Sequence, residues 1–336
     1  MKDGFLKAAA LSPALRVADC ADNVRQITDA LHKAAARGVK LAVFPEFCLT
    51  GYTCGDLFLQ RTLQTGALDA LSTLLDETKA LDVVTLVGLP LLVHGKLYNC
   101  AAVLCHGRIL GLVPKTYLPN YGEFYEKRQF TPGSTEVELV EVCGQQVPFG
   151  TSLLFRCRQM PSFVLGVEIC EDLLSALPPS AFHALAGATV IANLSASDET
   201  VGKAEYRRAL VSNQSARLLC GYLYASAGHG ESTQDMVFAG HDLIAENGTI
   251  LAENAPFDGG CAETEIDCQR MEAERARTTR FELRGAGHQP RAGGVGGVGH
   301  LVPLRQAHGA AAEAALHGPA AKAAFALPGA GRVAVY

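Results

Sequence analysis

The sequence has no long apolar run and no excess of basic residues, and each absence excludes a class of protein. No uninterrupted apolar stretch is long enough to cross a bilayer, and no apolar leader of signal-peptide type follows Met1. The net charge of −5 offers no basic surface for nucleic acid or for an acidic membrane. We therefore expect a soluble protein of the cytoplasm.

The eleven cysteines lack the spacing of a disulfide framework or of a zinc site. Most of them lie scattered in apolar stretches, which is typical of reduced thiols in a protein core. We therefore expect no bound metal. Cys170 differs from the others because it ends the apolar stretch 163–169 and is followed directly by two acids. Strand ends in α/β proteins are common places for reactive groups.

Predicted strands and helices alternate from the N-terminus to about residue 280, which indicates an α/β fold. Between them, residues 116–134 form a long loop rich in aromatic side chains, and such loops are usually functional. The predicted helices are 22–37, 63–81, 180–186, 203–219 and 269–280. The predicted strands are 5–11, 40–44, 83–92, 109–113, 152–157, 163–170, 189–194, 221–227, 235–239, 241–246, 249–253 and 262–267. Hairpin turns are predicted at 93–96 and 104–108, with apolar arms on either side.

The composition changes after about residue 280. Residues 284–336 contain a single acid, Glu313, and are dominated by Ala, Gly, His, Arg and Pro. We expect one domain over 1–280 and a low-complexity, poorly ordered tail over 281–336, with one Ala-rich helix near 309–317. This composition favours the hypothesis that the tail is a truncated or out-of-frame product.

Three polar residues follow the ends of apolar strands. Glu46 follows the strand 40–44, Lys115 follows the strand 109–113, and Cys170 closes the strand from residue 163. If these strand ends meet, a carboxylate can take the thiol proton and an ammonium can stabilise an oxyanion. The three side chains then describe amide hydrolysis through a thioester.

Each of the three residues also has an ordinary interpretation. A cysteine after a buried strand is usually a small apolar filler, and a lysine in a loop is usually solvated. Glu46 after Pro45 can simply cap a turn. Only the combination of compatible chemistry at three strand ends favours a catalytic site.

The local sequences around these residues carry a family resemblance. Residues 44–52 (FPEFCLTGY), 111–119 (GLVPKTYLP) and 166–173 (GVEICEDL) resemble, in the same order, the three catalytic motifs of the nitrilase (carbon–nitrogen hydrolase) superfamily. A narrower resemblance is to the N-terminal glutaminase domain of glutamine-dependent NAD+ synthetases. It rests on residues 53–58 (TCGDLF), 120–126 (NYGEFYE), 193–199 (NLSASDE) and 203–208 (KAEYRR), and it covers about residues 1–280.

The resemblance implies a role for each matching residue. By match, Glu46 is the general base, Lys115 stabilises the oxyanion, Cys170 is the nucleophile, and Glu123 is an additional glutamate that orients the lysine. The implied contacts to L-glutamine come from the following side chains: Tyr121, Ser197, Lys203, Glu171 and Tyr52. For the tyrosines the alternative is loop packing, and for Lys203 it is a solvated helix start.

The resemblance also implies a four-layer αββα sandwich that pairs with further copies of itself into a homo-oligomer. The glutaminase reaction needs no cofactor. ATP and nicotinic acid adenine dinucleotide would bind only a synthetase domain, whose Ser-Gly-Gly-x-Asp-Ser motif is missing here. The glycine-rich residues 293–299 lack that serine and aspartate, and we interpret them as linker.

The sequence therefore predicts the ammonia-releasing half of a glutamine-dependent NAD+ synthetase, with a separate synthetase domain or subunit as a further partner. Two alternatives remain open. One is a free-standing amidase or carbamoylase of the same superfamily, which would act on another small amide. The other is a non-catalytic remnant or subunit, against which the presence of Glu46, Lys115, Glu123 and Cys170 argues.

Overall fold

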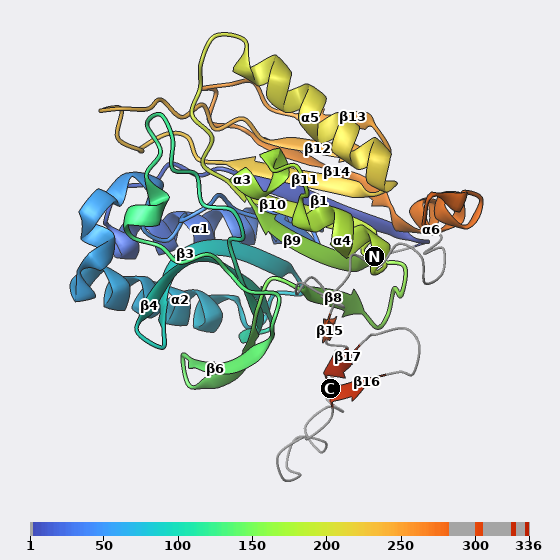
Figure 1. The fold of residues 1–336 in the computed structure, drawn as a ribbon, viewed down its shortest axis with the longest axis horizontal. Helices are drawn as coiled ribbons and strands as arrows, with labels where there is room; N and C mark the ends of the chain where they lie inside the picture. Colours follow the sequence, from blue (N-terminus) through green and yellow to red (C-terminus); the bar gives the residue numbers. More distant parts are fainter. Residues whose placement is uncertain (1–2, 282–299, 305–323, 327–332, 336) are drawn as a thin grey trace.

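Two β-sheets packed face to face form the centre of the protein in the computed structural model, which describes residues 3–281, 300–304, 324–326 and 333–335 (Figure 1). The first sheet has the strand order β14-β1-β2-β3-β4-β5-β7-β6, and the second has the order β13-β12-β11-β10-β9-β8-β15-β17-β16. Helices lie on the outer face of each sheet, which confirms the expected αββα sandwich.

The strands of the first sheet are β1 (Phe5–Leu11), β2 (Leu41–Val43), β3 (Val84–Val93), β4 (Lys96–Cys105), β5 (Arg108–Pro114), β6 (Glu138–Val142), β7 (Gln145–Phe149) and β14 (Cys261–Asp267). Those of the second are β8 (Leu153–Cys157), β9 (Val164–Ile169), β10 (Val190–Ser195), β11 (Gly221–Ser226), β12 (Leu243–Glu246), β13 (Thr249–Glu253), β15 (His300–Leu304), β16 (Ala324–Ala326) and β17 (Val333–Val335). The α-helices are α1 (Cys20–Ala36), α2 (Arg61–Thr78), α3 (Glu171–Leu174), α4 (Pro179–Leu185), α5 (Lys203–Leu218) and α6 (Cys268–Ala276). Three 3₁₀ segments are η1 (Tyr52–Leu59), η2 (Glu126–Arg128) and η3 (Thr279–Phe281).

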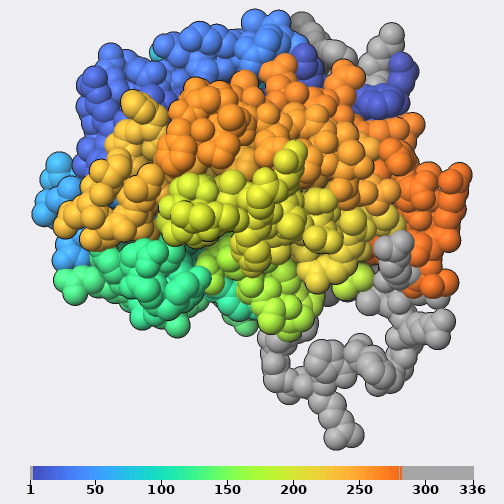
Figure 2. All heavy atoms as spheres, turned by 90° about the horizontal axis from the view of Figure 1, so that it is seen from above, coloured from blue at the N-terminus to red at the C-terminus, as the bar shows by residue number. Residues whose placement is uncertain are grey.

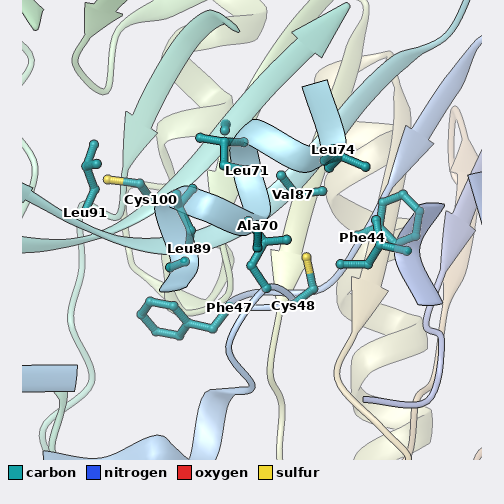
Figure 3. Close-up of a cluster of buried hydrophobic side chains, with 14 of the residues drawn as sticks. Phe44, Phe47, Cys48, Ala70, Leu71, Leu74, Val87, Leu89, Leu91 and Cys100 are labelled. Atoms are coloured by element: carbon teal, nitrogen blue, oxygen red, sulfur yellow. The ribbon is translucent and has the colours of Figure 1, made fainter. Parts of the chain in front are cut away.

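Helices α1 and α2 cover the first sheet because each presents an apolar stripe at three-to-four spacing. Figure 3 shows Leu71 and Leu74 of α2 packed over Val87 and Leu89 of β3. Phe47, which lies in the loop after β2, joins the same cluster. The segment that carries Glu46 is therefore anchored in the core on both sides.

A second apolar layer fills the space between the two sheets. It includes Val43 of β2, Val113 of β5 and Ile169 of β9, all of which are buried. These are the last or nearly the last residues of the strands that lead to Glu46, Lys115 and Cys170. The packing between the sheets thus fixes the three strand ends relative to one another.

Two segments differ from what the sequence predicted. Residues 235–239 were expected to form a strand, but Phe238 makes only an isolated bridge with Asp198, and its ring packs 5.8 Å from the ring of Tyr52. The β6–β7 hairpin was not predicted at all. In the structure Cys143 and Gly144 form its tight turn with φ values of 48° and 70°, and Gly144 is the sequence signal for such a turn.

The sequence also predicted no strand after residue 281. In the structure β15 pairs in parallel with β8, and β17 pairs with β15 and β16. The helix expected near 309–317 lies outside the described residues. The boundary between a domain over 1–280 and a tail over 281–336 stays a prediction.

Candidate active site

The structure brings the ends of β2, β5 and β9 to one place between the two sheets. The Glu46 amide donates to Ser195 O (3.3 Å), and the Cys170 amide donates to Leu194 O (3.0 Å), so both loops are tied to β10. The Lys115 amide donates to Asn99 O on β4 (2.8 Å). Glu46, Lys115 and Cys170 are all buried, and the charges of the first two act on the Cys170 thiol.

Lys115 lies between two carboxylates. Its Nζ is 2.7 Å from Oε1 of Glu46 and 2.7 Å from Oε1 of Glu126. Burial lowers the pKa of the ammonium, but Glu126 and Glu46 outweigh this effect and raise it well above its ordinary value. Lys115 therefore stays a cation in a place that excludes water.

Glu126, not Glu123, is the second carboxylate at Lys115, which corrects the expectation from the sequence. The Glu126 amide donates to Pro119 O (3.1 Å), and the 3₁₀ turn η2 directs its side chain inward, where it is 5% exposed. Phe130, four residues on, is buried on the same side, whereas Glu123 is exposed. The four-residue spacing of Glu126 and Phe130 was the signal that could have identified it.

A hydrogen-bond network that the sequence did not predict surrounds the two carboxylates. Asn99 Nδ2 donates to Glu46 Oε1 (2.5 Å) and lies 3.4 Å from Glu126 Oε2. The Tyr52 hydroxyl donates to Glu126 Oε1 (2.8 Å). Burial and the nearby Glu46 raise the pKa of Glu126 to about 7, against the opposing effect of Lys115. Glu46 Oε2 has no hydrogen-bond partner among the described residues.

Cys170 occupies a sharp corner between β9 and α3. Its φ of 45° and ψ of −101° are costly for a residue with a side chain, and such strain is typical of functional positions. Burial first, and then Glu46, raise the pKa of the thiol to about 12, while Lys115 opposes them. At neutral pH the thiol is therefore protonated and needs a base before it can attack.

Asp172 ties the lysine loop to the cysteine loop. Its Oδ1 accepts from the amides of Thr116 (3.1 Å) and Tyr117 (2.8 Å), directly after Lys115. Its Oδ2 accepts from the Ile169 amide (3.0 Å), directly before Cys170. The sequence singled out Asp172 only as an acid after the thiol; the structure gives it a bridging position.

The five residues expected to contact substrate fall into two groups. The Tyr121 hydroxyl donates to both carboxylate oxygens of Glu171, at 3.0 and 2.9 Å, and the charge of Asp198 acts on the same hydroxyl. Lys203 pairs with Asp198. Tyr52 stands apart from the other four residues, because its side chain is buried and its hydroxyl is bonded to Glu126.

Ser197 is supported by a buried arginine that the sequence did not single out. Arg207 on α5 donates to Ser197 Oγ (3.3 Å) and pairs with Glu199 (3.0 Å). The Ser197 hydroxyl in turn donates to Asp198 O (3.4 Å). Ser197 and Lys203 are thus connected through Asp198, on the side of Cys170 where Tyr121 and Glu171 lie.

A cavity of about 280 Å³ lies on the other side of Glu126. It is bounded by the segment that contains Glu123, Phe124 and Glu126 and by the segment that contains Asp235 and Met236, with Tyr52 as a further wall. In Figure 2 the green surface of the first segment adjoins the gold surface of the second. Tyr52 and Glu126 therefore separate Lys115 from this cavity.

Within the described residues, no group of three or more His, Cys, Asp or Glu side chains is arranged to hold a metal ion. The eleven cysteines all lie in the part of the chain that the structure describes, and none of them forms a disulfide. In the same part of the chain, no helix has the length and apolar character needed to cross a membrane.

Residues 7–276 match the carbon–nitrogen hydrolase family. The glutamine-dependent NAD(+) synthetase of Mycobacterium tuberculosis (strain H37Rv) is 45% identical over 281 residues, which cover 83% of this chain and 41% of that protein. The enzyme of the same name from Saccharomyces cerevisiae is 30% identical over 283 residues, covering 81% of this chain and 38% of that protein. The chain thus spans about two fifths of the length of these curated relatives.

Solved structures agree with these matches. The crystal structure of a glutamine-dependent NAD(+) synthetase from Cytophaga hutchinsonii has a TM-score of 0.70 at 29% identity, covering 78% of this chain and 43% of that one. An amidase of the nitrilase superfamily from Nesterenkonia has a TM-score of 0.60 at 20% identity, covering 81% of this chain and 96% of that one. At that identity the second likeness shows a shared fold only.

Proposed function

The chain belongs to the carbon–nitrogen hydrolase family, and we propose from this premise that it hydrolyses the side-chain amide of L-glutamine through a thioester on Cys170. One observation carries the proposal: a buried Lys115–Glu46 ion pair of 2.7 Å whose charges act on a buried thiol at a strained corner. The names of the 45% and 30% identical relatives support glutamine as the substrate.

In the proposed mechanism Glu46 Oε2 takes the proton of the Cys170 thiol as the sulfur attacks the amide carbon. A carbon–sulfur bond forms while the carbonyl oxygen becomes an oxyanion. The Lys115 ammonium stabilises that oxyanion because it is already fixed and desolvated. Glu46 then gives its proton to the amide nitrogen, the carbon–nitrogen bond breaks, and ammonia leaves.

The thioester is hydrolysed by the same groups in reverse order. Glu46 takes a proton from water, and the resulting hydroxide attacks the thioester carbon. Lys115 again stabilises the oxyanion, the carbon–sulfur bond breaks, and glutamate leaves as the sulfur regains a proton from Glu46. Glu126 supports both halves because it holds Lys115 from the side opposite Glu46.

The proposed contacts to glutamine follow from charge. Its α-amino group needs a carboxylate, and Glu171, held by the Tyr121 hydroxyl, offers one. Its α-carboxylate needs a cation and a hydroxyl donor, which Lys203 and Ser197 offer. Glu123 would contact no reacting atom, and Tyr52 would act through Glu126.

The released ammonia is proposed to serve NAD+ synthesis in the cytoplasm. The relatives whose names carry that activity are much longer than this chain, so the step that uses ATP and nicotinic acid adenine dinucleotide is assigned to a synthetase domain or subunit outside residues 7–276. The glutaminase step itself is proposed to need no cofactor. We also propose that the chain assembles into a homo-oligomer through its sandwich face.

The test is ammonia release from L-glutamine by the full chain and by Cys170→Ala. We expect release by the wild type and none by the folded variant. A panel of small amides and N-carbamoyl compounds, assayed in parallel, would expose an amidase: activity on these compounds with none on glutamine overturns the substrate. Equal rates for the two proteins overturn the nucleophile.

A further inference from the structure

Three buried polar residues on the helix-facing side of the second sheet have no part in the mechanism above. Glu168 lies on β9, Asn193 on β10 and Tyr222 on β11, and none of the three side chains is exposed. Asn193 is paired with Glu168 across the parallel strands, so both side chains point to the same face. Placing a carboxylate, an amide and a phenol there is costly unless each is hydrogen-bonded.

The three side chains form one chain of hydrogen bonds that ends at the nucleophile. The Tyr222 hydroxyl donates to Glu168 Oε1, and the Ser180 amide donates to Glu168 Oε2 (2.8 Å). Asn193 Nδ2 donates to the Tyr222 oxygen (3.2 Å). At the other end, Asn193 Oδ1 accepts from the Cys170 amide (3.1 Å).

Glu168 sets the direction of each hydrogen bond in this series. Burial raises the pKa of its carboxyl, while the hydrogen bonds from Tyr222 and Ser180 lower it. As a carboxylate it only accepts, so Tyr222 donates its single proton to Glu168 and offers only its oxygen to Asn193. The Asn193 NH₂ group must then face Tyr222, and its carbonyl must face Cys170. The Ser195 hydroxyl, which donates to the same carbonyl (2.7 Å), agrees with this orientation.

The series of hydrogen bonds ends at the Cys170 amide, where the main chain is strained. Its residue holds a φ of 45°, which a residue with a side chain adopts only when its surroundings enforce it. Leu194 O accepts from the same amide (3.0 Å), but it is a backbone group of the sheet and can impose only the sheet's own geometry. Asn193 supplies the second, side-chain contact at the corner.

We propose that Glu168, Tyr222 and Asn193 are positioning residues, which orient the Asn193 carbonyl and thereby hold the strained main chain of Cys170 so that its thiol is available to Glu46. This inference deepens the proposed glutaminase reaction and rests on it. It assigns no contact with substrate to any of the three.

The sharpest test is Glu168→Gln, which keeps the shape and reverses the polarity. The new NH₂ group would donate to Tyr222, Tyr222 would donate to Asn193, and the Asn193 NH₂ group would then oppose the Cys170 amide. We expect kcat on glutamine to fall about tenfold to a hundredfold, with KM changed less than twofold. Tyr222→Phe, which only removes the link, should lower kcat by a smaller factor of about three to ten.

Alkylation of Cys170 by iodoacetamide, followed by peptide mass spectrometry, gives a second readout that needs no glutaminase activity. Its rate should fall in both variants, while that of the exposed Cys261 should not change. The control is Ser215→Ala, which removes another buried hydroxyl, one that donates to Cys220 O (2.7 Å) just before β11, at the end of that strand remote from Cys170. It should lower the melting temperature and leave kcat and Cys170 alkylation as in the wild type.

The outcomes separate this inference from the proposed function. If Glu168→Gln and Tyr222→Phe lower only the melting temperature, as Ser215→Ala does, the three residues are structural and the inference is wrong. If Glu168→Gln does not fold, Tyr222→Phe decides alone by the same criterion. If the wild type releases no ammonia from glutamine, the proposed function fails, and the alkylation rates still decide the positioning role.

Discussion

The two sheets position their side chains in the candidate site through different interactions. The first sheet supplies Lys115 and Glu46, which with Glu126 form a buried cluster of opposite charges. The second sheet supplies Cys170, a neutral thiol at rest, whose main chain is held by dipolar hydrogen bonds from Asn193 and Leu194. The two sides therefore differ in what is fixed before a substrate binds. The first sheet holds fixed charges in place, and the second sheet holds the uncharged candidate nucleophile in a fixed geometry.

This division has a physical reason. A thiolate formed in advance would lie beside two carboxylates, and burial together with Glu46 already raises the pKa of the thiol to about 12. In the proposed mechanism the proton therefore moves to Glu46 as the carbon–sulfur bond forms. Substitutions on the two sides of the site should differ accordingly in their effect on activity, with the largest loss at Lys115.

Lys115→Met removes the central charge of the first-sheet cluster. We expect kcat to fall about a thousandfold, because the oxyanion loses its fixed cation. The two carboxylates would also be left facing each other, which should cost about 3–5 kcal/mol of unfolding free energy. Steady-state kinetics and urea unfolding measure both. The matched control is Lys127→Met at an exposed position, which should behave as the wild type. A Lys115→Met variant that keeps a tenth of the wild-type kcat would contradict the role proposed for Lys115.

Glu126→Gln and Glu123→Gln compare two glutamates three residues apart. Glu126 holds Lys115 at 2.7 Å, so its replacement should misplace the ammonium and lower kcat about tenfold to a hundredfold. Glu123 is exposed and should be replaceable with less than a twofold change. The reverse order of the two effects would restore Glu123 to the role that the family resemblance implied.

Asp172→Asn tests the bridge between the two sides. One amide NH₂ group would then face a backbone N–H that now donates to the carboxylate, which should cost about 1–3 kcal/mol of unfolding free energy and lower kcat about tenfold. Asp56→Asn, at an exposed pair with Arg128, is the control and should change neither quantity. A loss of stability with unchanged kcat would show that the bridge does not align the two loops.

Asp242→Asn concerns a buried carboxylate that, unlike Glu46 and Glu126, has no cation against it among the described residues. Its Oδ1 accepts from Ser12 Oγ (2.6 Å) and from the Ser226 amide (3.0 Å), and burial raises its pKa to about 7. Because the folded state holds this proton more tightly than the unfolded state, the associated stability is full below about pH 4 and is lost as the pH rises to about 7.

The wild type should therefore lose about 2–3 kcal/mol of unfolding free energy through Asp242 between pH 5 and pH 8, and Asp242→Asn should not. Urea unfolding of both proteins at the two pH values measures the difference. The substitution should leave activity unchanged at either pH, since Asp242 is bonded to Ser12, Ser226 and Asn254 and to none of the candidate catalytic side chains. Identical pH dependence in the two proteins would show that Asp242 is already ionised at pH 5.

The sequence predicted the parts of the molecule that depend on local pattern. Strand β9 was recognisable from its continuous apolar run, and the positions of Glu46, Lys115 and Cys170 followed from where their strands end. The sandwich and the residue roles came from the family resemblance, not from these patterns. The β6–β7 hairpin was missed although its turn at Cys143 and Gly144 had a local signal.

The parts that escaped prediction depend on contacts distant in sequence. Asn99 bridges Glu46 and Glu126 from β4, and nothing in the adjacent sequence indicates that this polar side chain is buried. The choice of Glu126 over Glu123 depends on a 3₁₀ turn inside a long loop. Asn193 lies within the motif 193–199, but its contact with the Cys170 amide spans 23 positions and exists only once β9 and β10 pair.

The proposed reaction brings the two sides of the site together in a thioester on Cys170, and hydroxylamine can trap that thioester. Added to the full chain with L-glutamine, hydroxylamine should intercept the acyl-enzyme and give γ-glutamyl hydroxamate at the expense of glutamate, with ammonia release maintained. Cys170→Ala should give neither product. Ammonia release by the wild type without any hydroxamate, at hydroxylamine concentrations that leave the enzyme active, would contradict a covalent intermediate on Cys170.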